Sequence, residues 1–196
     1  MKKIIFPATV FLFLSACNAG KEKDDEKNIN KVTPALAFIK SQAAMIDTSL
    51  FVIKKIVITD SLHSDTTDVH RNDFRLLAKD FLELPDISLK KYKEQYTEAK
   101  NYYSDLNLVS LITLPNNPAT AEIQKQELLI TPDSEGGKMK TIIIDREWVN
   151  KDSSVIKKMH WQVDKYFQIV TLKQIAGKPE TTQIVKVVWN DFTKQE

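Results

Sequence analysis

Two histidines and four aspartates crowd into residues 60–73 of this chain. Imidazole and carboxylate groups suit a divalent metal, so His63, Asp65, Asp68 and His70 are candidate ligands for a metal-dependent hydrolase built on residues 63–73. Their spacing, however, matches no established metal site. A solvated loop that leads into a helix explains the same residues, because aspartate caps helix N-termini and complements the helix dipole. The sequence therefore favours a loop, with no metal and no other cofactor.

Three tryptophans, Trp148, Trp161 and Trp189, lie in segments that we expect to be strands of one sheet. Tryptophans exposed on a sheet can stack on sugar rings or line the binding site of an apolar ligand. The competing interpretation is that they anchor the core, since tryptophan is highly buried on average. We favour the core and keep the three residues as candidate ligand contacts.

The usual motifs of nucleophilic and phosphate chemistry are missing from the sequence. It contains no Gly-x-Ser-x-Gly segment and no glycine-rich phosphate loop, and it has four glycines in all. The carboxylates of Asp145 and Glu147 project to the same side of a predicted strand, but Arg146 and Lys151 flank them, which is typical of a solvent-facing edge. The sequence indicates a protein that is not an enzyme.

The first sixteen residues have the three parts of a signal peptide. Lys2 and Lys3 form a basic start, residues 4–14 are largely apolar, and Leu14-Ser15-Ala16-Cys17 follows. The apolar run is too short to cross a hydrocarbon core of about 30 Å as a helix. We therefore expect residues 1–16 to be removed on export.

The segment Leu14-Ser15-Ala16-Cys17 resembles the lipobox of bacterial lipoproteins, in which leucine, a small residue and alanine or glycine precede an invariant cysteine. The resemblance implies that Cys17, the only cysteine in the chain, carries a diacylglycerol by a thioether and further acyl chains such as palmitate. These chains would be the contact with the membrane. It also implies that Asn18, in place of a retention aspartate, directs the protein to the outer membrane. The resemblance does not distinguish the periplasmic face of that membrane from the cell-surface face.

Residues 17–31 are the lipidated cysteine followed by a polar tether, and residues 32–196 form a single domain. The chain has 28 Lys and Arg against 26 Asp and Glu, and removal of Lys2 and Lys3 leaves the mature form with no net charge. A domain without excess positive charge that is exported from the cytoplasm is not expected to bind nucleic acid.

The first half of the domain contains helical patterns. Residues 34–47 are predicted to be a helix, with Thr33 as its N-cap and Pro34 at its first position. Its apolar seam runs on as far as Leu50 and Val57. Residues 51–59 are predicted to be a strand, although one long helix is an alternative. A polar loop at 60–68 and a second helix at 71–83 follow, and residues 88–103 fit either a helix or irregular structure.

The pattern of the second half predicts strands separated by turn residues. The predicted strands are 106–114, 122–131, 138–150, 154–164, 166–175 and 181–189. Short connections make neighbouring strands antiparallel, so we expect an α+β fold. In this fold, N-terminal helices precede a meander of about six strands, which can curl into a half-barrel.

These features favour a lipid-anchored envelope protein that acts as a non-enzymatic binding or scaffold module. The residue pattern of 65–82, in which Asp65-Thr66-Thr67 precedes the apolar and basic segment 74–82, resembles that of small lipoproteins of uncharacterised function from Bacteroidota. The main alternative is a carrier of an apolar ligand in the style of lipoprotein-localisation factors, and the third is the hydrolase on residues 63–73.

Overall fold

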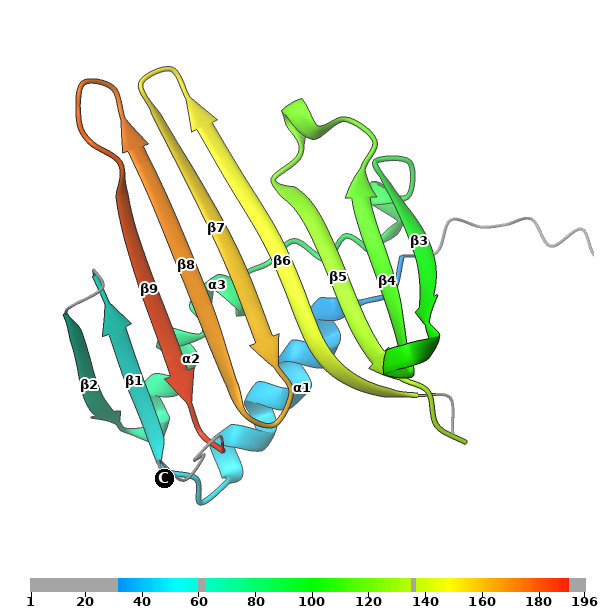
Figure 1. Ribbon diagram of the computed structural model, residues 1–196, viewed down its shortest axis with the longest axis horizontal. Helices are drawn as coiled ribbons and strands as arrows, with labels where there is room; N and C mark the ends of the chain where they lie inside the picture. The colour runs from blue at the N-terminus through cyan, green and yellow to red at the C-terminus, as the bar shows by residue number, and fades with distance from the viewer. Residues whose placement is uncertain (1–31, 60–62, 135–136, 191–196) are drawn as a thin grey trace, which may run out of the picture.

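The computed structural model describes residues 32–59, 63–134 and 137–190. Within these residues nine strands form one antiparallel sheet in the order β2-β1-β9-β8-β7-β6-β5-β4-β3 (Figure 1). Strands β3 to β9 follow one another as a meander, and β1 pairs with β9 at its end. The sheet is open, with β2 and β3 as its edges. The α+β class is confirmed.

The strands account for most of the described chain. Their bounds are Ile53–Ile58 (β1), Ser64–Val69 (β2), Tyr96–Tyr103 (β3), Leu108–Pro115 (β4), Ile123–Thr131 (β5), Lys138–Asn150 (β6), Ser153–Gln162 (β7), Tyr166–Ile175 (β8) and Thr181–Val188 (β9). The last six correspond to the six strands predicted for the meander. The strand predicted at 51–59 is also confirmed as β1.

One face of the sheet carries the helices, and we call the opposite face the outer face. The helices are Ala35–Thr48 (α1), Phe74–Leu77 (α2) and Lys79–Leu82 (α3), and all three lie behind the sheet in Figure 1. Short 3-10 turns occupy Arg71–Asp73 (η1), Lys90–Tyr92 (η2), Ser104–Leu106 (η3) and Pro118–Thr120 (η4).

The core lies between the helices and the sheet, and alternation along each strand builds its sheet side. In β7, Met159 and Trp161 are fully buried, while Ile156, Lys158 and His160 belong to the outer face. From α1, the residues Ala35, Ile39, Ala43 and Ile46 are buried at helical spacing. This strand therefore has a buried face toward the helices and a more exposed outer face.

The sheet has three strands more than the predicted meander of six. One is β1. A second is β2, which falls where a polar loop was predicted at 60–68. It pairs with β1 from Ser64 to Val69 and is an edge strand with both faces largely exposed. Its polar side chains therefore remain in contact with water and lose no hydration on folding. Charged residues are common on such edge strands. The third is β3, within the segment 88–103 that had no firm assignment.

Two helix predictions need correction. The single helix at 71–83 is wrong, because η1, α2 and α3 are separate short turns and the backbone leaves helical geometry at Ala78. The long-helix alternative is also wrong, since α1 ends at Thr48. Leu50 consequently leaves the predicted seam and is 93% exposed. Helices therefore alternate with strands, rather than all preceding them.

The first turn of α1 is attached to the sheet by the side chain of Glu98 on β3. Its carboxylate accepts hydrogen bonds from the backbone N–H of Thr33 (2.8 Å) and from the hydroxyls of Thr33 (2.9 Å) and Thr113 (3.1 Å). Gln126 donates to the carbonyl of Thr33 (3.1 Å). Pro34, not Thr33, is the N-cap residue. The described chain thus begins at the β3 edge of the sheet.

Candidate functional site

The candidate metal ligands are spread along the edge strand β2. Asp65 and Asp68 lie three positions apart in a strand, so their side chains point to opposite faces of the sheet. His63 and His70 lie just outside the two ends of β2, and all four residues are exposed. Among the described residues, no group of three or more His, Cys, Asp or Glu side chains is placed to hold a metal ion.

Two of the candidate tryptophans belong to the core. Trp161 and Trp189 are 0% exposed and contact Phe74, Phe81 and Phe167, with ring centroids between 5.1 and 6.4 Å apart. Phe74 meets both indoles edge-on, a favourable arrangement for aromatic rings. A ligand cannot stack on these two tryptophans in this structure.

Trp148, the third candidate, is half-buried beyond the helices, on the same face as Arg146 and Lys157. The guanidinium carbon of Arg146 lies 4.4 Å from the centre of its ring, and the Lys157 ammonium lies 5.7 Å away. Such contacts between cations and aromatic rings are attractive. Two protein cations therefore lie near the Trp148 ring, where a ligand would otherwise stack.

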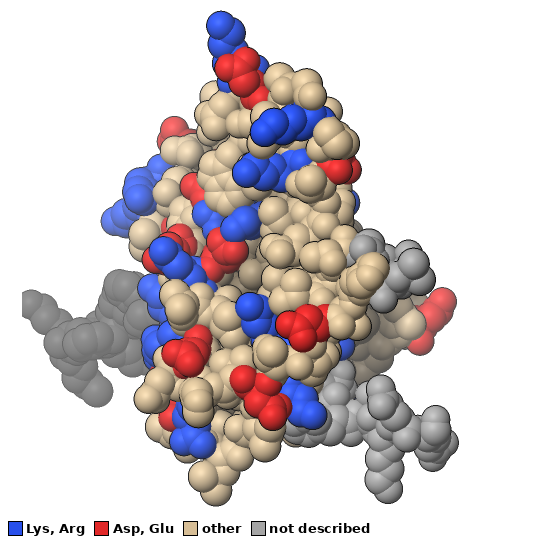
Figure 2. All heavy atoms as spheres, turned by 90° about the vertical axis from the view of Figure 1, so that its left-hand side faces the viewer, with Lys and Arg blue, Asp and Glu red and all other residues tan. Residues whose placement is uncertain are grey.

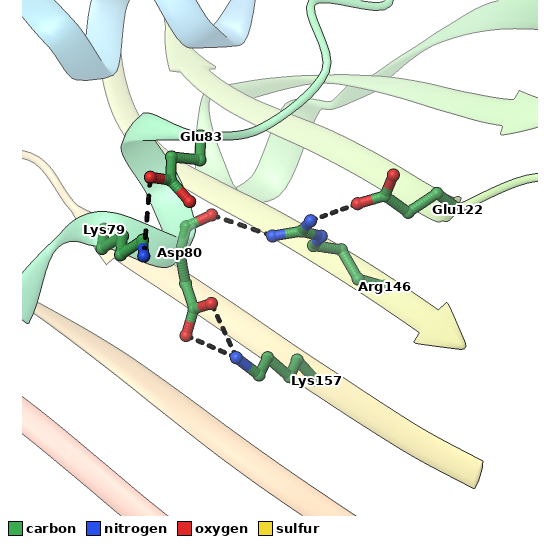
Figure 3. A network of polar contacts seen from close by, with 6 residues as sticks. All are labelled: Lys79, Asp80, Glu83, Glu122, Arg146 and Lys157. Carbon is green, nitrogen blue, oxygen red and sulfur yellow. Dashed lines mark hydrogen bonds and ion pairs between the residues drawn. The ribbon is translucent and has the colours of Figure 1, made fainter. Parts of the chain in front are cut away.

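Arg146 and Lys157 also hold α3 against the sheet (Figure 3). Arg146 donates to the backbone carbonyl of Asp80 (3.0 Å) and pairs with the carboxylate of Glu122. The Lys157 ammonium lies 2.6 Å from both carboxylate oxygens of Asp80. Arg146 is 7% exposed, and a buried guanidinium must have partners to offset its desolvation. The two terminal nitrogens of Arg146 are bonded within this cluster, while its buried Nε has no hydrogen-bond partner among the described residues, and the cluster acts as a structural clamp.

Family models, curated proteins and solved structures give no match to this chain. The functional argument therefore depends on the residues of the chain itself.

The outer face of the sheet is not covered by any helix of the described part of the chain. An apolar group made of Ile156, Val170, Leu172 and Ile184 spans β7, β8 and β9, and each member is half-buried. The carboxylate pair of Asp145 and Glu147 also belongs to this face. Asp145 lies between Lys125 and Lys158 in the register, so its neighbours are complementary charges rather than a catalytic partner.

A polar group adjoins this apolar one. The rings of His160 and Tyr166 meet edge-on with centroids 5.6 Å apart, and the Lys186 ammonium lies 4.1 Å from the Tyr166 ring centre. Burial lowers the pKa of His160, and the positive charge of Lys186 lowers it further. The imidazole is therefore held in its neutral form on a face that combines apolar, aromatic and basic side chains.

The hollows of the described surface do not resemble a substrate site. A small space between α1 and the sheet, lined by Leu36, Leu84, Ile123 and Ile144 among others, has a volume of about 10 Å³, which is room for one water. A hollow of about 570 Å³ near the β8–β9 turn opens to solvent and is lined mostly by threonine and charged residues.

The charge distribution agrees with the near balance of 28 basic and 26 acidic residues. Basic and acidic side chains are interspersed over the face at the β2 edge, as Figure 2 shows. Of the helices in the described part of the chain, none has the length and apolar character needed to cross a membrane. The predicted lipidation site, Cys17, lies outside the described residues, as do the predicted signal peptide and tether.

Sequence reasoning missed two sets of residues that the fold brings together. One is the clamp of Asp80, Glu122, Arg146 and Lys157, whose members are up to 77 positions apart. The other is the exposed end of β3, where Tyr102 and Tyr103 lie. In β3 polar side chains occupy both faces, so the alternation that identifies a half-buried strand is weak there.

Proposed function

We propose that this chain is a lipid-anchored protein of the cell envelope, and that its folded part is a non-enzymatic binding or scaffold module. The observation that carries the proposal is the segment Leu14-Ser15-Ala16-Cys17 after a basic and apolar start. Cys17 is the acylated residue in this proposal, and the acyl chains are the membrane contact. Asn18 after the cysteine supports a location at the outer membrane.

The geometry of the described domain supports a binding role rather than catalysis. The core is filled by α1, α2, α3 and the inner side chains of the sheet, while the outer face is free of helices. A broad face with half-buried apolar residues beside polar ones is the kind of surface that binds a protein. The outer face is therefore the surface on which we place the module's contacts.

The two alternative functions find less support. A carrier of acyl chains needs an enclosed apolar cavity of roughly 300–1,000 Å³, whereas the space lined by Leu36, Leu84 and Ile123 holds about 10 Å³ and the hollow of about 570 Å³ near the β8–β9 turn opens to solvent. A metal-dependent hydrolase needs converging ligands, whereas Asp65 and Asp68 diverge along β2. We therefore propose neither.

The anchor is tested by expressing the chain with an alkyne analogue of palmitate. Wild type is expected to take the label and to sediment with outer membranes. Cys17→Ala should lose the label, while Ser15→Ala should keep it, because the lipobox needs only a small residue there. Absence of label on wild type would overturn the anchor. Protease added to intact cells then distinguishes a surface location, where the domain is cut, from a protected periplasmic one.

The binding role is tested in the same cells with a photo-crosslinking amino acid. At Val170 on the outer face it is expected to yield a discrete adduct with an envelope component. At Leu76, which is 70% exposed on the helical side, it serves as the matched control. Equal behaviour of both positions would contradict the assignment of the contacts to the outer face.

A further inference from the structure

The turn between β3 and β4 presents three exposed apolar side chains. Tyr102 is 59% exposed, Tyr103 is 44% exposed and Leu106 is 68% exposed. They lie within five residues of one another, at the end of β3 and in the turn η3. We call these three residues the β3–β4 tip. Tyr102 and Tyr103 are consecutive strand residues and project to opposite faces of the sheet, so the tip exposes apolar side chains on both sides of the edge strand, and such side chains indicate a contact surface.

The composition of the tip is that of a protein segment at a membrane interface. Tyrosine is enriched there because its ring is apolar and its hydroxyl stays hydrated. The Tyr102 hydroxyl donates to the side-chain oxygen of Asn107 (3.2 Å), which adopts the left-handed conformation that closes the turn. The exposed Lys100 precedes the tip on β3 and offers an ammonium to lipid phosphates.

The tip lies at the same edge of the sheet as the start of the described chain. Thr33 is bound to Glu98, five residues before Tyr103 on β3. At about 3.4 Å per residue, this separation is roughly 17 Å along the strand. From Thr33, α1 leads away across the sheet toward β1, as Figure 1 shows. The β3 edge is therefore the part of the described domain nearest to the N-terminal segment.

We infer that the β3–β4 tip inserts Tyr102, Tyr103 and Leu106 into the interfacial region of the bilayer that holds the lipid anchor. This inference rests on the proposed lipidation of Cys17. The tether predicted from the sequence has fifteen residues, and a flexible chain of that length has a root-mean-square span of about 20 Å. That span is comparable with the roughly 17 Å of strand between Glu98, which binds Thr33, and Tyr103. The tether thus keeps the tip at the bilayer surface, and the tip orients the outer face relative to it.

The experiment uses the full acylated protein in vesicles and a single introduced thiol. Because Cys17 is the only cysteine and its sulfur would be in a thioether, Leu106→Cys is then the one reactive thiol. Leu50→Cys is the matched control, since Leu50 is an exposed leucine (93%) after the far end of α1. Each variant carries an environment-sensitive nitrobenzoxadiazole dye in phosphatidylethanolamine–phosphatidylglycerol vesicles, with or without brominated acyl chains.

We expect the dye at position 106 to emit at shorter wavelength and to be quenched by brominated lipid, while the dye at position 50 is not quenched. Equal, unquenched emission at both sites would overturn the inference. The inference would also be overturned if the blue-shifted emission at position 106 increased with the amount of protein per vesicle but was not quenched by brominated lipid. In that case a second copy of the protein, and not the bilayer, would cover the tip.

Acylation is measured on the same samples by mass spectrometry, so that the two proposals fail separately. Acylated protein with an unquenched dye at position 106 refutes the membrane contact and leaves the anchor intact. A free Cys17 thiol refutes the anchor, and the inference falls with it.

Discussion

At the scale of single residues, position along a strand decides which side chains can act together. Arg146 and Trp148 share the helix-covered face with Lys157, whereas Asp145, Glu147 and His160 belong to the outer face. Residues adjacent in the sequence therefore have unrelated environments. His160 shows the effect most clearly, because its half-buried imidazole lies in the same cross-strand row as Lys186.

The lowered pKa of His160 predicts a pH dependence of stability. Below the ordinary value of 6.5, the unfolded chain binds the proton more readily than the folded chain. The stability of the folded state is therefore complete above that value and decreases as the pH falls through it toward the lowered pKa. Urea unfolding of wild type and His160→Gln from pH 7.5 to 5 measures the difference.

In His160→Gln this part of the pH dependence should vanish, while the contribution of the carboxylates remains. Lys186→Gln is the companion variant, since it removes the second cause of the shift and should weaken the dependence. Parallel pH profiles of wild type and His160→Gln would contradict the assignment.

At the scale of elements, short helices need partners outside themselves. A helix of four residues such as α3 is not stable alone, because helix formation has a costly nucleus. It is stabilised by Phe81, which packs on Trp161 and Phe167, and by the bonds from Arg146 and Lys157 to Asp80. Apolar burial and the polar clamp thus act on the same turn.

Arg146→Ala should consequently destabilise the protein by about 2 kcal/mol, because it leaves Glu122 and the Asp80 carbonyl without their partner. The loss is no larger because the Glu122 side chain is 38% exposed, and water screens its attraction to Arg146. Lys79→Ala is the control, since the exposed pair of Lys79 and Glu83 contributes only about 0.3 kcal/mol. Chemical denaturation measures both values. Similar losses in the two variants would argue against the clamp.

At the scale of the whole molecule, the sheet joins distant parts of the chain. Strand β1, which ends at Ile58, pairs with β9, which begins at Thr181. The meander of seven strands joins neighbours along the chain, whereas β1 and β2 belong to the sheet through the pairing of β1 with β9. The order of the strands therefore couples the first and last thirds of the described chain.

This coupling predicts a single cooperative unfolding transition. Loss of far-ultraviolet circular dichroism, which reports the strands, should coincide with the shift of tryptophan emission, which reports the buried Trp161 and Trp189. Two transitions with different midpoints would mean that β1 and β2 unfold separately from the meander. Trp148→Phe provides the control, because it removes the half-buried tryptophan and leaves the two in the core.

The sequence by itself determined those features that depend on local periodicity and turn residues. Alternating apolar residues predicted the last six strands within a few positions, and Asp164, the last residue of the predicted strand 154–164, has a positive φ of 62° and lies in the turn after β7. The helical spacing of Ile39, Ala43 and Ile46 predicted α1. The N-terminal lipobox pattern is likewise local, and the proposed location follows from it alone.

Only the tertiary structure decided what depends on distant partners. The polar strand β2 exists because β1 supplies its hydrogen bonds, and no local pattern reveals that pairing. The clamp around Arg146 and the attachment of Thr33 to Glu98 each join residues more than twenty positions apart. Because such contacts depend on which strands become neighbours, the metal candidates separate along an edge, and Tyr102 and Tyr103 stay exposed on the edge strand that binds the start of the described chain.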